Sequence, residues 1–305
     1  RRDERFCSLR SAFRTGDETR YNRTRRRRPV DPRSRDGHSR PHSSYLGSFD
    51  VGAVVPEIYR LTARRKMANK FRLVILALVA ILPSALARPS LRLFFGYKIG
   101  KRVRVGFSII DARECEIGDD ASIGHFNVFT GIKRLSIGEH TRIGVLNVFR
   151  GGDEVRIGRY CEILRLNEIN SIPEPEVVNE TDPRFLMGDG SMIGASHKID
   201  FTDRVEFGKR VILGGRNSSI WTHNRQRTLP VSIGEKSYVG SEIRIAPGGA
   251  IPPRCIVGIG SVITAAFTTE YRLIAGVPAK EIKELDDEAK FLTEKKTRND
   301  LPDDI

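Results

Sequence analysis

The chain has 305 residues, enough for one large domain with extensions. Its net charge of +14 would suit a nucleic-acid-binding protein, but the distribution of the charges along the chain argues against this interpretation. Residues 1–66 hold 18 Lys and Arg against 8 Asp and Glu, so +10 of the charge belongs to this segment. The remaining +4 is ordinary for a soluble domain, and we expect no nucleic-acid partner.

Residues 1–66 are predicted to be a disordered basic extension. Four consecutive arginines at 25–28 lie among Ser, Pro, Asp and Gly, a composition that cannot bury enough apolar surface to offset chain entropy. One interpretation is an arm for nucleic acid or anionic lipid. The favoured one is an over-extended translation or a dispensable extension, because the first methionine is Met67 and the sequence from there resembles an ordinary protein start.

Residues 67–95 form an apolar and basic segment that is expected to be helical. Its apolar stretch at 73–87 is shorter than the roughly 20 residues that span a bilayer. Lys70 and Arg72 before it and the Ala-Leu-Ala at 85–87 would suit a cleaved signal peptide. The alternative is a helix that lies in the membrane surface.

The cysteines show neither C-x-x-C spacing nor a disulfide framework, so we expect buried thiols in a reducing compartment: Cys7, Cys115, Cys161 and Cys255.

A six-residue repeat dominates the rest of the chain. Aliphatic residues recur at 233, 239, 245, 251, 257 and 263, and again from 99 to 129 with one exception. This period matches neither a helix nor an ordinary strand. It is explained by a triangular coil in which each face is a short strand with one side chain pointing inward, and a small residue turns each corner. The sequence therefore predicts an all-β domain over residues 96–280, a parallel β-helix of about eight coils.

The middle coils are longer than three plain hexapeptides, because aliphatic positions recur at 117, 137 and 157. Asn127, Asn147 and Asn167 share this period and are expected to bond from coil to coil. Residues 170–186 break the register and should project as a loop of about ten extra residues. The pattern then resumes through Ser219. Residues 281–305 are predicted to be a short helix and a tail, with the helix over 281–296 capping the last coil.

The stretch at 233–280 resembles the hexapeptide acyltransferase superfamily. It carries I-G-x-x-x-Y-V-G, then V-G-I-G-S-V-I-T, and closes on A-G-V-P-A-K. The Trp-Thr-His-Asn turn at 221–224 and the S-x-H-x-x-D element at 196–200 are similar to the branch that O-acetylates surface polysaccharide and lipopolysaccharide. The resemblance covers about residues 92–284.

This resemblance implies a left-handed coil and a homotrimer. The active sites would lie in clefts between the triangular β-helices, called prisms here, of neighbouring subunits. Acetyl-CoA would be a co-substrate lying along the coils, with no bound cofactor. A histidine would act as general base on a sugar hydroxyl of a glycan or its precursor, and the hydroxyl would attack the thioester directly. Because that donor is cytosolic, we favour the surface helix over the signal peptide, with peripheral membrane contact through 73–95 at the inner face of the membrane.

His223 is the preferred base, because it occupies a wide corner of its coil and an unperturbed imidazole titrates near neutrality. Asp203, one regular coil earlier in the chain, is expected to orient it. His197 falls on the asparagine period, so it is either a ladder residue or a second active-site histidine. Asp200 is a weaker candidate for an orienting carboxylate.

The other histidines are not assigned to the site: His38 and His42 in the extension, and His125 and His140 in regular coils. The resemblance assigns the donor to backbone and lysine positions: Gly240, Ser241, Gly258, Gly260, Ser261, Ala275, Gly276, Lys280 and Lys283. Trp221 and Asn224 are expected to line the acceptor cleft, although packing between subunits is an equal alternative for Trp221.

Three alternatives remain. A zinc enzyme on this fold would need three histidine ligands, typically with two of them five residues apart, and no histidine pair has that spacing, so no metal site is expected. A catalytically silent trimeric scaffold would use the fold alone. Within the acyltransferases, the acceptor could be the amine of an amino sugar or the hydroxyl of serine.

Overall fold

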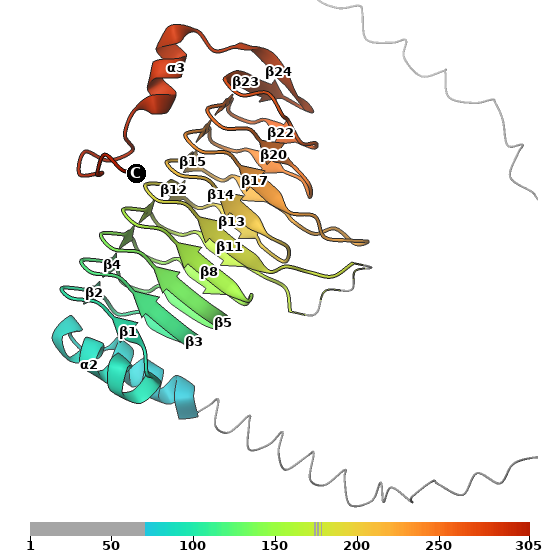
Figure 1. Ribbon diagram of the computed structural model, residues 1–305. Helices are drawn as coiled ribbons and strands as arrows, with labels where there is room; N and C mark the ends of the chain where they lie inside the picture. The colour runs from blue at the N-terminus through green and yellow to red at the C-terminus, as the bar shows by residue number, and fades with distance from the viewer. Residues whose placement is uncertain (1–70, 174, 176, 178) are drawn as a thin grey trace, which may run out of the picture. The chain divides into compact units, whose positions relative to one another are not determined.

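The computed structural model describes residues 71–173, 175, 177 and 179–305 (Figure 1). Residues 1–66, Cys7, His38 and His42 lie outside the described residues. The described chain forms the predicted left-handed parallel β-helix, with short helices at both ends (Figure 1). Each coil contributes one short strand to each of three faces, so that the chain turns three corners per coil.

The strands of one face follow one another through successive coils. The first face comprises β1 (Lys98–Ile99), the second halves of β3 (Ile109–Ile117) and β5 (Val128–Ile137), β8 (Glu154–Ile157), β11 (Arg184–Met187), β14 (Val205–Phe207), β17 (Val231–Ile233) and β20 (Ala250–Ile251). The second face comprises β2 (Arg104–Val105), β4 (Ser122–Ile123), β6 (Arg142–Ile143), β9 (Glu162–Ile163), β12 (Met192–Ala195), β15 (Ile212–Arg216), β18 (Tyr238–Val239), β21 (Ile256–Val257) and β23 (Arg272–Gly276). The third comprises the first halves of β3 and β5, then β7 (Val148–Arg150), β10 (Glu168–Asn170), β13 (Lys198–Asp200), β16 (Ser219–Ile220), β19 (Arg244–Ile245) and β22 (Val262–Ile263).

The core is a column of inward side chains at the predicted six-residue positions. Ile117 pairs with Ile137, and Ile137 with Ile157, in parallel register. Phe129 and Phe149 stack with ring centroids 4.6 Å apart, and both are fully buried. Each such side chain contributes about 1.5–3 kcal/mol through removal from water. Glycine follows many of them because successive coils approach closely there.

The asparagine ladder is confirmed. The Nδ2 of Asn147 donates to Oδ1 of Asn127 at 3.0 Å, and the Nδ2 of Asn167 donates to Oδ1 of Asn147 at 3.0 Å. All three side chains are buried. The buried backbone N–H groups of Asn147 and Asn167 also find their acceptors in the side chain of the coil below.

The C-terminal part differs from the prediction in three respects. Within the described chain, nine strands rather than eight stack on the second face, because β23 continues this face beyond the last six-residue repeat at Ile263. β23 also pairs antiparallel with β24 (Ala279–Glu284). The helix is shorter than predicted: α3 (Asp287–Glu294) begins where the Asp286 side chain accepts a hydrogen bond from the Ala289 N–H. The hairpin, not the helix, covers the edge of the last coil on this face.

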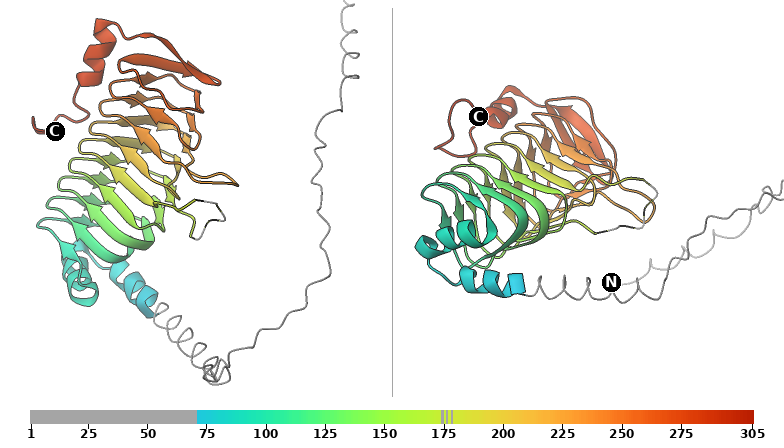
Figure 2. Two further views of the ribbon diagram at one scale, coloured as in Figure 1. Left: turned by 45° about the vertical axis from the view of Figure 1, so that its right-hand side comes forward. Right: turned by 60° about the horizontal axis from the view of Figure 1, so that its bottom comes forward.

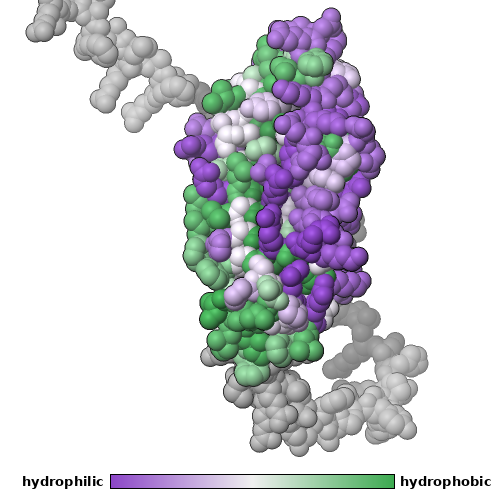
Figure 3. Space-filling view, turned by 90° about the vertical axis from the view of Figure 1, so that its left-hand side faces the viewer, coloured by the Kyte–Doolittle hydropathy of each residue, from purple (hydrophilic) through white to green (hydrophobic). Residues whose placement is uncertain are grey.

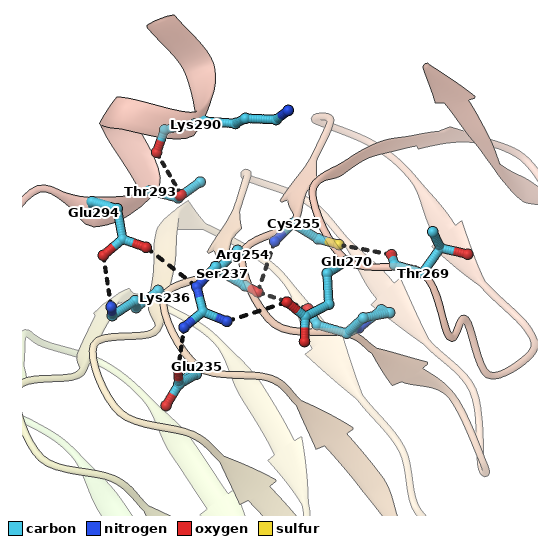
Figure 4. A network of polar contacts seen from close by, with 11 residues as sticks. Glu235, Lys236, Ser237, Arg254, Cys255, Thr269, Glu270, Lys290, Thr293 and Glu294 are labelled. Carbon is cyan, nitrogen blue, oxygen red and sulfur yellow. Dashed lines mark hydrogen bonds and ion pairs between the residues drawn. The ribbon is translucent and has the colours of Figure 1, made fainter. Parts of the chain in front are cut away.

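The helix α3 instead lies along the side of the upper coils (Figure 4). Glu294 accepts hydrogen bonds from Lys236 at 2.6 Å and from Arg254 at 3.2 Å. The Lys236 hydrogen bond lowers the pKa of Glu294. Arg254 also reaches Glu235 and Glu270, so one guanidinium ties the helix to two coils.

The third corner, where the chain passes from the third face to the first, carries the insertions. Ile157 pairs with Met187 and not with position 177, which confirms the predicted loop of about ten extra residues. A second insertion was not predicted as such: Phe207 pairs with Ile233 and not with position 227. The two insertions are called here the long loop (171–183) and the short loop (221–230), and both project from the same edge of the prism (Figures 1 and 2).

The register also shifts by one residue between β12 and β15. The extra residue is accommodated at Gly215, whose φ of 63° is readily accessible to glycine. Because of this bulge, Ile220 points into the core and not Ser219, which corrects the predicted inward position.

Two helical segments close the first coil. Residues 71–80 are helical, and α2 (Ser84–Phe95) follows. Arg72 holds the first segment in place through Asp111, the Tyr97 hydroxyl and the Ala112 carbonyl. Within the described residues, no helix has the length and apolar character needed to cross a membrane.

The three described cysteines are buried, as predicted. Burial raises the pKa of the Cys115 and Cys161 thiols to about 12, and it also raises the pKa of Cys255.

Candidate active site

The two loops of the third corner are joined to each other. The Asn179 side chain, in the long loop, accepts a hydrogen bond from the Thr228 N–H at 2.9 Å and donates to its hydroxyl at 2.9 Å and its carbonyl at 3.2 Å. Thr228 is buried in the short loop and forms an antiparallel bridge with His223. The short loop is therefore a small hairpin that the long loop supports from one side.

His223 lies at the base of this hairpin and pairs with a carboxylate. Its Nδ1 lies 2.8 Å from Oδ2 of Asp200, the last residue of β13. The His223 side chain is 23% exposed, whereas that of Asp200 is 6% exposed. Because a carboxylate accepts, Nδ1 carries the proton, which leaves the lone pair on Nε2.

Four further groups bind the Asp200 carboxylate, and the weakest of these contacts is the Thr202 N–H at 3.4 Å from Oδ1. Oδ2 accepts from the Thr222 N–H at 3.0 Å and from its hydroxyl at 2.8 Å. Oδ1 accepts from the Thr202 hydroxyl at 2.6 Å. The Thr202 oxygen in turn accepts from the Ile172 N–H at the start of the long loop. The buried carboxylate is thus held rigidly by groups from the coil and from both loops.

Asp203 does not orient His223, which corrects the prediction. Its Oδ1 accepts the N–H of Arg204, and its own N–H donates to the Thr222 hydroxyl. The reason is the register: Ile199 aligns with Ile220 and not with Ser219, so the chain leaves the third face above Asp200 and His223 turns back over that residue.

The predicted acceptor residues lie on the same loop. Trp221 is 44% exposed, and its ring is edge-on to that of His223 with centroids 6.4 Å apart. The Asn224 side chain, in contrast to Trp221, is already used within the loop. Its Oδ1 accepts hydrogen bonds from the N–H groups of Gln226 and Arg227. That side chain closes the tip of the hairpin, as asparagine commonly does in turns.

The geometry of His197 favours the ladder alternative. It is fully buried, its N–H donates to Oδ1 of Asn167 at 2.9 Å, and its Nδ1 accepts the Ser218 N–H at 3.1 Å. Burial lowers the pKa of His197 to about 4. The Gly215 carbonyl partly offsets this effect, although Nε2 makes no hydrogen bond of normal geometry to any described group. A neutral imidazole thus takes the place of an asparagine, and in the next coil Ser218 continues the ladder by donating its N–H to the imidazole.

The predicted donor residues gather at a different corner. Gly240, Gly258 and Gly276 each end or follow a strand of the second face, at the second corner, where the chain turns toward the third face. Ser261 is fully buried, and its hydroxyl donates to the Gly258 carbonyl and accepts the Gly276 N–H, so it ties two coils together. Gly260 has open space beside it. Lys280 is exposed on β24, and Lys283 pairs with Asp286.

His223 and these glycines are therefore separated by the width of the third face within one chain. As for metals, no group of three or more His, Cys, Asp and Glu side chains that could hold an ion occurs among the described residues.

The chain was compared with family models and with curated proteins. No family model matches the chain. A stretch of 63 residues, 21% of the chain, is 33% identical to the galactoside O-acetyltransferase of Escherichia coli K12, and it spans 30% of that relative's length. The structure itself shows the six-residue repeat and the parallel β-helix that the repeat forms.

Solved structures that align with part of the chain include several transferases. A hexapeptide transferase family protein from Anaplasma phagocytophilum aligns over 66% of the chain and 86% of its own, at 15% identity and a TM-score of 0.32. The N-acyltransferase AntD from Bacillus cereus aligns over 68% and 93%, at 15% identity and a TM-score of 0.35. The polySia-specific acetyltransferase NeuO aligns over 62% and 81%, at 16% identity and a TM-score of 0.36. TM-scores this low carry no information about the site.

Proposed function

We propose that this hexapeptide-repeat protein is an acyl-CoA-dependent O-acyltransferase that moves an acetyl group from acetyl-CoA to a hydroxyl of a sugar, in a surface glycan or its precursor. One observation carries the proposal: a carboxylate fixes Nδ1 of His223, and the imidazole lies beside a half-exposed tryptophan at the edge of the prism. An oriented neutral imidazole next to an aromatic ring suits a sugar hydroxyl that must lose its proton.

The chemistry is a direct transfer. Nε2 of His223 takes the proton of the acceptor hydroxyl while the oxygen forms a bond to the thioester carbonyl carbon. When the resulting tetrahedral species collapses, the carbon–sulfur bond breaks, and the imidazolium returns its proton to the CoA thiolate. Asp200 stabilises the imidazolium between the two proton transfers, as the buried carboxylate of a hydrolase triad does.

The site is completed by a second copy of the chain. His223 is at the third corner and the donor glycines are at the second, so a neighbouring copy must bring its second corner to His223. The lower coils of that second corner present a ridge of exposed apolar side chains, called here the apolar ridge: Phe107, Phe126, Leu146 and Leu166. A ridge of this kind is typical of a surface that another subunit covers. The repeated geometry fits a homotrimer with three shared sites.

The proposal is tested by release of free thiol from acetyl-CoA, with a panel of neutral sugars, amino sugars, serine and glycan extracts as acceptors. Wild type should release thiol with a hydroxyl acceptor, and His223→Ala should lower kcat by about 100-fold or more. His140→Ala is the matched control, because His140 is a partly exposed histidine that stacks on Tyr160 in a regular coil.

Release of thiol by no acceptor would favour the silent scaffold. Transfer only to amines would favour an N-acyltransferase. Activity that survives His223→Ala would contradict the assignment of the base.

A further inference from the structure

The N-terminal end of the prism carries an apolar surface that the fold does not use. Apart from Arg72, the helix at 71–80 is apolar on all sides. One side buries Leu76 and Val79 against the first coil, and the opposite side leaves Phe71, Val74 and Leu78 exposed. A helix that is apolar all round normally has a second partner.

The helix α2 extends the same surface. Leu86, Leu93 and Phe94 are exposed on it, and Leu93 is 79% exposed. Figure 3 shows apolar side chains concentrated at this end of the molecule, while the surface above it is largely hydrophilic on one side and carries a mixed apolar stripe on the other. Continuous exposed apolar surface of this kind marks an interaction site.

The charge around this surface has one sign. No Asp or Glu occurs between residues 71 and 110, whereas seven cations do: Arg72, Arg88, Arg92, Lys98, Lys101, Arg102 and Arg104. Acidic partners come from the coils behind: Asp111 for Arg72, Asp120 for Arg102 and Glu116 for Lys98.

The two arginines of α2 pair with no carboxylate among the described residues. Arg88 and Arg92 donate to backbone carbonyls, of Ser84 and of Ile99 and Gly100 respectively, and a carbonyl does not neutralise a cation. The helical end of the prism is therefore apolar at its centre and cationic at its margin.

We propose that this end of the prism docks onto the surface of a bilayer that contains anionic lipids. Leu78, Leu93 and Phe94 enter the boundary between headgroups and acyl chains, and Arg88 and Arg92 meet the lipid phosphates. The described helices are too short to span the bilayer, so the contact is peripheral.

Charge favours this occupant over two others. A second copy docked end to end would place two cationic margins against each other. The chain's own segment 1–66 carries 18 Lys and Arg against 8 Asp and Glu, so it would add positive charge to the surface rather than compensate it. A cyclic trimer of the kind proposed above would turn three such ends to the same side, and the three contacts would act together.

The test is flotation of the full chain with two kinds of vesicle, neutral phosphatidylcholine alone and phosphatidylcholine mixed with phosphatidylserine. Wild type should bind the mixed vesicles and lose this binding as salt is raised. Leu78→Glu and Leu93→Glu should each weaken binding by about tenfold or more, and Arg88→Gln by about fivefold.

Two matched controls lie outside the surface. Phe291→Glu changes an exposed phenylalanine on α3, at the opposite end of the prism (Figure 1), and Lys209→Gln removes an exposed lysine from an upper coil. Neither should change binding.

The proposal is overturned if wild type binds neither vesicle, or if the controls lose as much binding as the helix variants. It is also overturned if the helix variants lower the assembly's mass in light scattering, which would assign the surface to a second copy. Thiol release by the same variants in detergent-free solution distinguishes this result from failure of the proposed acyl transfer.

Discussion

The proton on Nδ1 of His223 is held by one carboxylate, and Asp200 accepts it at 2.8 Å. Removal of the negative charge should let the imidazole adopt the other tautomer, in which Nε2 carries hydrogen and cannot act as a base. Asp200→Asn is therefore expected to lower kcat by about 100-fold or more. Steady-state thiol release measures this effect.

Asp203→Asn is the matched control, since that carboxylate caps the N–H of the following residue and does not contact the imidazole. It should leave kcat within about a factor of three, because a neutral oxygen can still accept this bond. Equal losses in the two variants would mean that the Asp200–His223 pair has no special role.

His197 predicts an acid-sensitive fold. Its pKa is about 4 in the folded chain and about 6.5 in the unfolded one, so the unfolded state binds a proton that the folded state rejects. The stability from this group is complete above pH 6.5 and is lost as the pH falls toward 4, by about 2 kcal/mol at pH 5.

His197→Asn should remove this dependence, because asparagine occupies the same ladder position at Asn127, Asn147 and Asn167. Thermal unfolding measured between pH 7 and pH 5 should show a smaller drop in Tm for the variant than for wild type. An equal drop in both proteins would show that other groups cause the acid sensitivity.

The sequence pointed to His223 as the candidate base, but it ranked the two possible orienting carboxylates in the wrong order. His223 could be chosen because it is the histidine that lies in a wide corner of a coil. Asp200 was named only as the weaker candidate, because its alignment with the short loop depends on a bulge at Gly215, and counting one regular coil back from His223 leads to Asp203. Register shifts of this kind leave no periodic signal.

At the scale of elements, the link between the two loops should govern how well His223 is placed. Asn179 binds Thr228 through three hydrogen bonds, and Thr228 bridges to His223 in the same hairpin. Asn179→Ala should lower kcat about tenfold while the KM for acetyl-CoA stays constant, because the donor corner is untouched.

Glu180→Ala is the control for this variant, since the exposed neighbour contributes only its backbone carbonyl to the contact. The Tm of Asn179→Ala should remain within a few degrees of wild type, because the loop bases are held separately through Thr202 and Asp200. A large fall in Tm together with kcat would reduce Asn179 to a structural residue.

The strands were predictable because every coil repeats one environment: a single inward side chain per face and a close approach at the corner. The elements that were missed depend on contacts outside the repeat. The hairpin of β23 and β24 pairs antiparallel after the six-residue pattern has ended, and the short loop is defined by side-chain bonds from another loop.

At the scale of the whole molecule, the proposed base and the proposed donor site lie at different corners of the prism. The third face lies between the corner of His223 and the corner of Gly240, Gly258 and Gly276. In a single chain, an acceptor bound at His223 and a donor bound at the second corner could therefore not react with each other. The apolar ridge at that second corner gives a physical reason for copies to associate. Only the family resemblance, and no periodicity, pointed to this assembly from the sequence.

Mixed oligomers test this arrangement most directly. One parent is His223→Ala, which lacks the base. The other is Gly260→Phe, which fills the open space at the donor corner. Its fold should survive, because Phe126 and Leu146 occupy the equivalent corner position in lower coils with a φ of 60°.

Each parent alone should be inactive in thiol release. When the two are unfolded, mixed in equal amounts and refolded together, about a quarter of the interfaces should combine an intact base with an intact donor corner, and about a quarter of wild-type activity should return. A mixture as inactive as its parents would contradict the shared site, and with it the proposed path of the acetyl group.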